Sequence, residues 1–150
     1  RMTASLIRRL YHLDHLNLDV PNLARVFLET ATSALTVECA ALFSFDDKGH
    51  GFRLLHAIGF SPSPEGLLAD IHVPSGFRHC NSATPRDEFS QALERLSGTP
   101  YFLWAYDAGT GTALFFGNRE EDLQLRQRFS ADDGEAIEAA LDVFINVSER

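Results

Sequence analysis

The densest group of reactive side chains in the sequence is the run Phe77-Arg78-His79-Cys80-Asn81. Arg78 carries the fixed fork of donors that clamps an anion, and His79 is a residue type that ligates haem iron. Cys80 offers a thiol that could attach a bilin or sense oxidants. The competing interpretation is a polar surface loop that binds nothing. The run by itself leaves these alternatives open.

A single imidazole, that of His56, interrupts an otherwise apolar strand face. Side chains alternate along a strand, so His56 is predicted to share its face with Phe52, Leu54, Ile58 and Phe60. A buried imidazole needs a hydrogen-bond partner or a ligand. A histidine bonded to backbone is the simpler interpretation, and contact with a ligand is the second.

Aromatic side chains form the third candidate group. Phe102, Trp104 and Tyr106 occupy alternate positions of a predicted strand and should share one face. Together with Phe77 and Phe89 they could line a ligand pocket or pack against each other and fill it. Lining and filling produce the same sequence pattern.

The bulk composition excludes several classes of function. With 150 residues and 45% hydrophobic content the chain is one domain's worth. A net charge of −8 and the lack of a Lys/Arg cluster argue against nucleic-acid binding. No apolar run approaches the ~18 residues of a membrane span, and two cysteines form no disulfide framework, so we expect a cytoplasmic protein. Catalytic motifs such as Gly-x-Ser-x-Gly are missing, and we expect no enzyme activity.

Two predicted hairpins and five helices organise the chain. The hairpins join residues 39–45 to 52–60 and residues 101–106 to 112–116, each across a glycine-bearing turn. Helical spacing is predicted in an amphipathic lead-in helix within residues 1–18 and in segments 20–35, 86–96 and 131–148. Residues 65–71 are predicted to form a short helix, and residues 73–84 an irregular stretch.

This order predicts an α+β fold with an antiparallel sheet of about five or six strands. The N- and C-terminal helices should cover one face of the sheet, and short helices and loops the other. Residues 19–150 would form the domain. Arg1 before Met2 and the end of the chain within a helical pattern lead us to expect a fragment of a longer protein.

The last helix carries two apolar stripes. Ile137, Leu141 and Phe144 belong to one stripe, and the second contains Ala136, Ala139, Val143 and Val147. A helix that is apolar on two sides needs two partners. The first is expected to be the sheet, and the second a further copy of the chain.

Five segments in this order resemble a GAF domain, a sensory module of bacterial signalling proteins. They are the run Cys39-Ala40-Ala41-Leu42-Phe43, the turn Asp46-Asp47-Lys48-Gly49, the strand end Leu55-His56-Ala57-Ile58-Gly59-Phe60, the strand from Gly111 to Gly117, and the helix start Phe129-Ser130-Ala131-Asp132-Asp133. The resemblance covers about residues 19–148. PAS domains are the second choice, and the two helices before the first strand favour GAF.

The resemblance implies a regulatory small-molecule sensor, a homodimer whose terminal helices relay ligand state to an output domain in the same chain. The pocket would lie between residues 60 and 106, near the run from residue 77 to residue 81. The cofactor is unknown. Haem is not favoured, and a bilin fits poorly because His79 precedes Cys80 whereas bilin-binding members have cysteine followed by histidine. The Asn-Lys-Phe-Asp motif of cyclic-nucleotide binders is absent. The alternatives are a ligand-free dimerisation module with a collapsed pocket, and a redox or haem-based sensor.

Overall fold

The structure is a computed structural model that describes residues 8–35, 37–46, 51–61, 64, 79–81, 88–98, 101–118 and 131–149. Its elements along the chain are η1 (His12–Leu16), α2 (Val20–Leu35), β1 (Cys39–Asp46), β2 (Gly51–Ile58), β3 (His79–Asn81), α3 (Glu88–Ser97), β4 (Tyr101–Asp107), β5 (Thr112–Asn118) and α4 (Ala131–Ser148). The short helix predicted at residues 65–71 lies outside the described residues.

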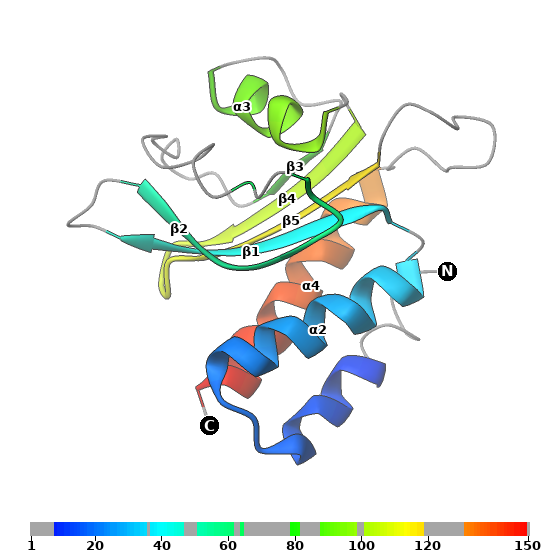
Figure 1. Ribbon diagram of the computed structural model, residues 1–150, viewed down its shortest axis with the longest axis vertical. Coiled ribbons are helices and arrows are strands. Elements are labelled where there is room, and N and C mark those ends of the chain that lie inside the picture. Colours follow the sequence, from blue (N-terminus) through cyan, green and yellow to red (C-terminus); the bar gives the residue numbers. More distant parts are fainter. Residues whose placement is uncertain are drawn as a thin grey trace.

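The strands form one five-stranded sheet in the order β2-β1-β5-β4-β3. Every neighbouring pair is antiparallel. Figure 1 shows α2 and α4 on one side of this sheet and α3 on the other. The predicted α+β architecture, with terminal helices on one face, is therefore confirmed.

Two hydrophobic cores lie on the two faces of the sheet. The helix-side core joins Leu42, Leu114 and Phe116 of the sheet to Phe27 of α2 and Phe144 of α4, whose rings lie 5.1 Å apart between centroids. The second core lies beneath α3, and its aromatic members are described below. Because strand residues alternate between faces, the central strands β1 and β5 contribute to both cores.

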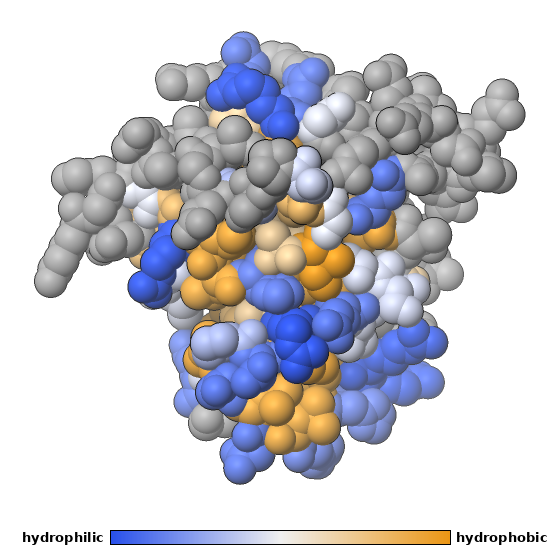
Figure 2. All heavy atoms as spheres, viewed as in Figure 1, coloured by the Kyte–Doolittle hydropathy of each residue, from blue (hydrophilic) through white to orange (hydrophobic). Residues whose placement is uncertain are grey.

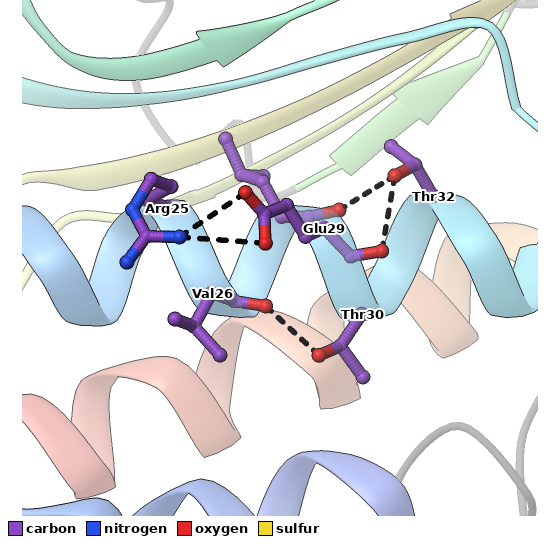
Figure 3. Close-up of polar contacts among 6 residues, drawn as sticks. Arg25, Val26, Glu29, Thr30 and Thr32 are labelled. Carbon is purple, nitrogen blue, oxygen red and sulfur yellow. Dashed lines mark hydrogen bonds and ion pairs between the residues drawn. The ribbon is translucent and has the colours of Figure 1, made fainter.

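Helix α2 begins where the sequence predicts. The Asn22 N–H donates to Oδ1 of Asp19 at 3.0 Å, which is the contact of an N-cap, and Pro21 lies in the first turn. On the polar side of the helix, Arg25 pairs with Glu29 at 3.2 Å. On another side, next to the helix-side core, the half-buried Thr30 hydroxyl donates to the Val26 carbonyl at 2.8 Å (Figure 3). The helix thus satisfies these polar groups locally.

An irregularity in β2 overturns the predicted face of His56. His56 pairs with Leu42, but the next pair along is Leu54 with Phe43, so Leu55 is an extra residue in β2. Such a bulge shifts the alternation of side chains by one position. Leu54 therefore packs beneath α3, whereas Leu55 and Ile58 pack in the helix-side core. His56, opposite the helix-side residue Leu42, is half-buried on that same face, away from Phe52 and Phe60.

One further prediction is wrong, because residues 79–81, predicted to be irregular, form the short edge strand β3 beside β4. In the second apolar stripe of α4, Ala136 and Val143 are each 3% exposed within the chain's own helix-side core. Ala139 and Val147 of the same stripe are half-buried.

The lead-in segment is helical over residues 8–11 and continues as the 3-10 helix η1. It ends at Asn17, whose φ of 53° is the left-handed conformation that terminates many helices. Leu10 and Leu13 are buried in the helix-side core. The tighter 3-10 winding changes which side chains share a face, and Leu16 is half exposed.

Candidate functional site

The face of the sheet beneath α3 is built mainly from aromatic rings, and we call it the aromatic face. Its rings are those of Phe43, Phe45, Phe52, Phe60, Phe102, Trp104, Tyr106 and Phe115. Phe52 is the hub of one group, with its ring centroid 5.2 Å from that of Phe45, 5.4 Å from Trp104 and 5.6 Å from Tyr106. These contacts are edge-to-face, the geometry that ring quadrupoles prefer.

The contacts of Phe52 require a curved sheet. Strands β2 and β4 are separated by β1 and β5, so in a flat sheet they would lie about 14 Å apart at the usual strand spacing. Rings from both strands nevertheless meet. The bulge at Leu55 bends β2, as bulges do. In the strand pairing, Ala113 of β5 lies between Phe43 of β1 and Tyr106 of β4, and its side chain is only a methyl group. Curvature and a small central residue together bring the rings into contact.

Helix α3 covers this face. Ala92, Leu93 and Leu96 pack against the rings and are nearly inaccessible to solvent. Gly98, directly after the last helical residue, has a φ of +71°. Phe52 and Trp104 are 4% and 0% exposed, whereas Phe45, Phe60 and Tyr106 are only partly buried. The described part of the face thus has a closed aromatic centre and a more open border.

Of the predicted site residues, Phe102, Trp104 and Tyr106 do share the aromatic face. Phe102 is 3% exposed and Tyr106 is half-buried. His56 is not with them, because it lies on the helix side of the sheet. The structure therefore assembles the β4 part of the predicted site and separates the β2 imidazole from it.

The remaining predicted residues are only partly described. Phe77 and Arg78 lie outside the described residues, and Phe89 belongs to α3. In β3, the backbone of His79 pairs with Ala105 and that of Cys80 with Trp104. In the sheet, the backbone of Cys80 therefore lies directly opposite that of Trp104, whose ring belongs to the centre of the aromatic face.

The strand order also bears on the redox interpretation. Cys39 in β1 and Cys80 in β3 are separated by β5 and β4, a backbone distance of about 14 Å at the usual strand spacing. A disulfide requires Cα atoms less than ~7 Å apart. The folded chain cannot join its own two cysteines. Cys39 is buried, and its thiol donates to the Gly117 carbonyl at 3.3 Å.

Sequence reasoning missed the hub of the site. Phe52 comes from β2, and its partners Phe43 and Phe45 come from β1, the strand paired to it. The signal was present, because Phe52 and Leu54 alternate at the start of β2. The strand order that places β2 within reach of β4 is a non-local property, which no local pattern indicates.

The chemistry open to this face is apolar contact and ring stacking. The polar groups of its described aromatic members are the Tyr106 hydroxyl and the Trp104 indole N–H. Within the described residues no three His, Cys, Asp or Glu side chains come together to hold a metal ion. None of the helices in the described ranges has the length and apolar character needed to cross a bilayer.

No protein-family model matches the sequence, and no curated protein does either. Solved structures do match the fold. The GAF domain of an Acinetobacter phosphoenolpyruvate-protein phosphotransferase aligns at a TM-score of 0.66 with 16% identity, over 97% of this chain and 91% of that chain. A phycocyanobilin-bound GAF domain from a cyanobacterial phytochrome aligns at 0.64 with 13% identity, over 97% and 93%.

A methyl-accepting chemotaxis protein, residues 122 to 287, aligns at a TM-score of 0.61 with 15% identity, over 93% of this chain and 97% of that chain. These likenesses extend across the whole sheet with its flanking helices, although sequence identity is low throughout. They agree with the resemblance found in the sequence. The chain is therefore a domain with the GAF fold.

Proposed function

We propose that the chain is a regulatory sensor domain of a larger cytoplasmic signal-transduction protein, without catalytic activity of its own. It binds a small molecule and relays ligand state through its terminal helices, as a homodimer, to an output domain in the same chain. The observation that carries this proposal is the fold likeness to domains of a phytochrome, a chemotaxis protein and a phosphotransferase.

The aromatic face is the proposed ligand side. Its half-buried border residues Phe45, Phe60 and Tyr106 adjoin the closed centre formed by Phe52 and Trp104. Because rings dominate the described residues of this face, a ligand with a flat, apolar part would bury the most surface against them. Polar recognition would then come from the Tyr106 hydroxyl or from other parts of the chain.

The strands supply the proposed relay. Phe102 and Trp104 of β4 belong to the aromatic face, whereas Leu103 and Ala105 of the same strand belong to the helix-side core with α4. A close-packed interior transmits displacement. A shift of β4 caused by a ligand would therefore reach α4 across the thickness of one sheet.

Trp104 provides the test, because it is the one tryptophan of the chain and is fully buried in the aromatic face. Its emission should shift when a ligand binds there. A panel of metabolites would be screened by thermal stabilisation, and each stabilising compound titrated against Trp104 emission. We expect at least one compound both to raise the midpoint of thermal unfolding and to change the emission of Trp104.

A Trp104→Phe variant is the control, since it keeps a ring on the face but removes the signal. Stabilisation should persist in that variant while the emission change disappears. A compound that stabilises both proteins without altering Trp104 emission would bind elsewhere. No stabilising compound in the panel, and no extra mass retained in a native mass spectrum, would count against the sensor proposal.

A ligand-free dimerisation module with the same fold is the second candidate. It is favoured by the ring contacts themselves, because the centre of the aromatic face is occupied by Phe52 and Trp104, only 5.4 Å apart between centroids. A ligand would have to spread these rings or use the border. A native mass spectrum showing a bare dimer would support this candidate, and a dimer with extra mass would support the sensor.

A further inference from the structure

Three aromatic rings at the border of the aromatic face meet at steep angles. The ring centroid of Phe52 lies 5.2 Å from that of Phe45 and 5.6 Å from that of Tyr106, and the centroids of Phe45 and Tyr106 are 6.5 Å apart. The interplanar angles are 63°, 85° and 74° in that order. We call these three residues the ring triad. Rings at such angles can turn more than one face toward the same point, which parallel stacked rings cannot do.

The ring triad is partly open to solvent. Phe52 is 4% exposed and lies at its base, whereas Phe45 and Tyr106 are half-buried. Each of these two residues therefore keeps some surface in contact with water. A ligand can reach them without spreading the closed centre of the face, where Phe52 contacts Trp104.

The apolar surface at the other end of the molecule has a different character. Figure 2 shows an apolar patch over the lead-in helical segment, where Leu16, Leu18 and Val20 are exposed. These side chains are aliphatic and offer only hydrophobic contact, which has no preferred direction. The ring triad adds an electrostatic property, because aromatic rings carry a quadrupole.

The face of an aromatic ring is the negative part of its quadrupole and attracts cations. Groups of rings are used to bind quaternary ammonium ions, whose charge is spread over methyl groups. A primary ammonium would need acceptors for its three N–H bonds, and the polar oxygen that the described part of the aromatic face supplies is the Tyr106 hydroxyl. The ring triad therefore suits a quaternary ammonium better than a primary one.

The turn between β4 and β5 places a negative charge beside the ring triad. Asp107 directly follows Tyr106, and residues 107–111 include neither lysine nor arginine. The Asp107 carboxylate accepts from the Thr110 N–H at 2.9 Å and from the Thr110 hydroxyl at 2.7 Å. These hydrogen bonds hold the carboxylate at the end of β4. Its charge favours a cation over an anion at the neighbouring ring.

The turn between β1 and β2 also carries more acid than base. Asp46 directly follows Phe45 at the end of β1. Residues 47–50 lie outside the described residues, and their sequence adds Asp47, Lys48 and His50. Two acids against one lysine give residues 46–50 a formal charge of −1 with the histidine neutral. Both turns at this end of the sheet are thus acidic.

The arginine of β2 does not oppose this charge pattern on the same face. Arg53 is exposed, but its neighbours Phe52 and Leu54 both belong to the aromatic face. Alternation along the strand therefore directs Arg53 to the opposite face. The net charge of −8 on the whole chain also attracts cations from a distance.

We propose that the ring triad binds the quaternary ammonium group of a small organic cation. The methyl groups rest on the rings of Phe45 and Tyr106, with Phe52 beneath them, and the acids of the two turns favour the positive charge. This deepens the proposed function by naming the chemical class of the ligand. It rests on that proposal only for the regulatory meaning of binding.

The test compares two probes of the same shape. Choline carries a trimethylammonium group, and 3,3-dimethylbutanol is its neutral analogue, with carbon in place of nitrogen. Each is titrated with the 150-residue chain while the proton resonance of its methyl groups is followed, because protons held over a ring face shift upfield. Choline should bind at least about fivefold more tightly than the neutral probe, the scale of a partly exposed cation–π contact.

Substitutions locate the site. Phe45→Leu and Tyr106→Leu should each reduce the ratio of the two affinities to less than about twofold, because an aliphatic side chain keeps the apolar contact but lacks the quadrupole. Tyr106→Phe keeps the ring and should keep the preference for choline. Tyr11→Leu is the matched control, since Tyr11 is an exposed tyrosine at the other end of the molecule, and it should leave the ratio unchanged.

The ratio is informative even where a variant loses stability, because both probes then lose the same fraction of folded protein. Circular dichroism checks the fold of each variant. Equal affinities for the two probes would overturn the proposal, since the site would then recognise apolar shape alone. No binding of choline at millimolar concentration would overturn it too. A ratio that falls in Tyr11→Leu but not in the variants of the ring triad would place the cation elsewhere.

The outcomes also separate this inference from the proposed sensor function. Choline binding that depends on the ring triad, with no compound in the metabolite panel altering the emission of Trp104, would support the site and count against the sensor. A neutral metabolite that stabilises the chain and alters that emission, while choline shows no preference over its neutral analogue, would support the sensor and contradict the inference.

Discussion

Gly59 closes β2 against the start of β1, and its backbone leaves no room for a side chain. Its φ is +82°, a conformation that side-chain-bearing residues adopt at a cost of about 1–2 kcal/mol. A Cβ atom at this position would lie 2.0 Å from the Glu38 carbonyl oxygen and 3.0 Å from the Cys39 Cα. Both neighbours are backbone atoms, which cannot rotate away. The residue is therefore required by geometry and needs no functional explanation.

Gly59→Ala should lower the free energy of unfolding by about 3 kcal/mol or more, because steric overlap adds to the conformational cost. Chemical denaturation measures this loss. Gly98→Ala is the matched control, since Gly98 has a φ of +71° but nothing within 4 Å of an added Cβ. It should show only the conformational part. Equal losses at the two positions would mean that the contact with Glu38 is relieved by a shift of the strand.

At the scale of elements, the aromatic face depends on the pairing of large and small side chains across the strands. Ala113 of β5 is fully buried between Phe43 and Tyr106 in the register. The rings of Phe52 and Trp104 meet on this face from strands on either side of β5. A larger residue at position 113 would compete with those rings for the same space.

Ala113→Leu should therefore destabilise the chain by about 1–3 kcal/mol, the usual cost of overpacking a core. The free energy of unfolding, measured in denaturant, gives the answer. Ala108→Leu serves as control, because Ala108 is exposed in the β4–β5 turn, and should change stability by less than about 0.5 kcal/mol. If Ala113→Leu is tolerated as well as the control, the face has free volume, and the ligand-free candidate loses its main support.

Elements were predictable from the sequence where a local signal marks them. Both hairpins, the Asp19 cap of α2 and the end of α3 at Gly98 follow from alternation and turn chemistry. Strand β3 was missed because three residues are too few to show periodicity. The bulge at Leu55 was missed because an extra residue is defined only by its partner strand, and with it the face of His56 was predicted wrongly.

The site was predictable to the same extent. Alternation on β4 is local, so the shared face of Phe102, Trp104 and Tyr106 was predicted correctly. The contact of Trp104 with Phe52 depends on the strand order and on the curvature of the sheet, which no single segment encodes. The two stripes of α4 are real, but which surface covers each depends on how α2 and the lead-in segment pack.

For the molecule as a whole, the sheet is the common wall of two cores. Ala40 and Leu42 of β1 face the helix-side core, while Ala41 and Phe43 of the same strand face the aromatic side. All four are completely buried. Neither core can lose its packing without exposing strands that the other core also needs. The two faces should therefore unfold as a single unit.

This coupling can be measured, because each face has its own probe. Trp104 emission reports the aromatic face, and far-ultraviolet circular dichroism reports mainly the helices of the opposite side. Both should give the same midpoint in denaturant, as expected for two-state unfolding. Phe144→Ala, which removes the ring packed on Phe27, should lower both midpoints together by the equivalent of about 3–5 kcal/mol.

The comparison of the two probes in Phe144→Ala also bears on the relay. A ligand on the aromatic face can influence the terminal helices only if the stabilities of the two faces are coupled. Allostery is such a coupling free energy between two sites, and it acts in both directions. If the dichroism midpoint falls while the Trp104 midpoint stays fixed, the two faces are independent. Binding beneath α3 would then have no route to α4, and signalling through the helices would need a different origin.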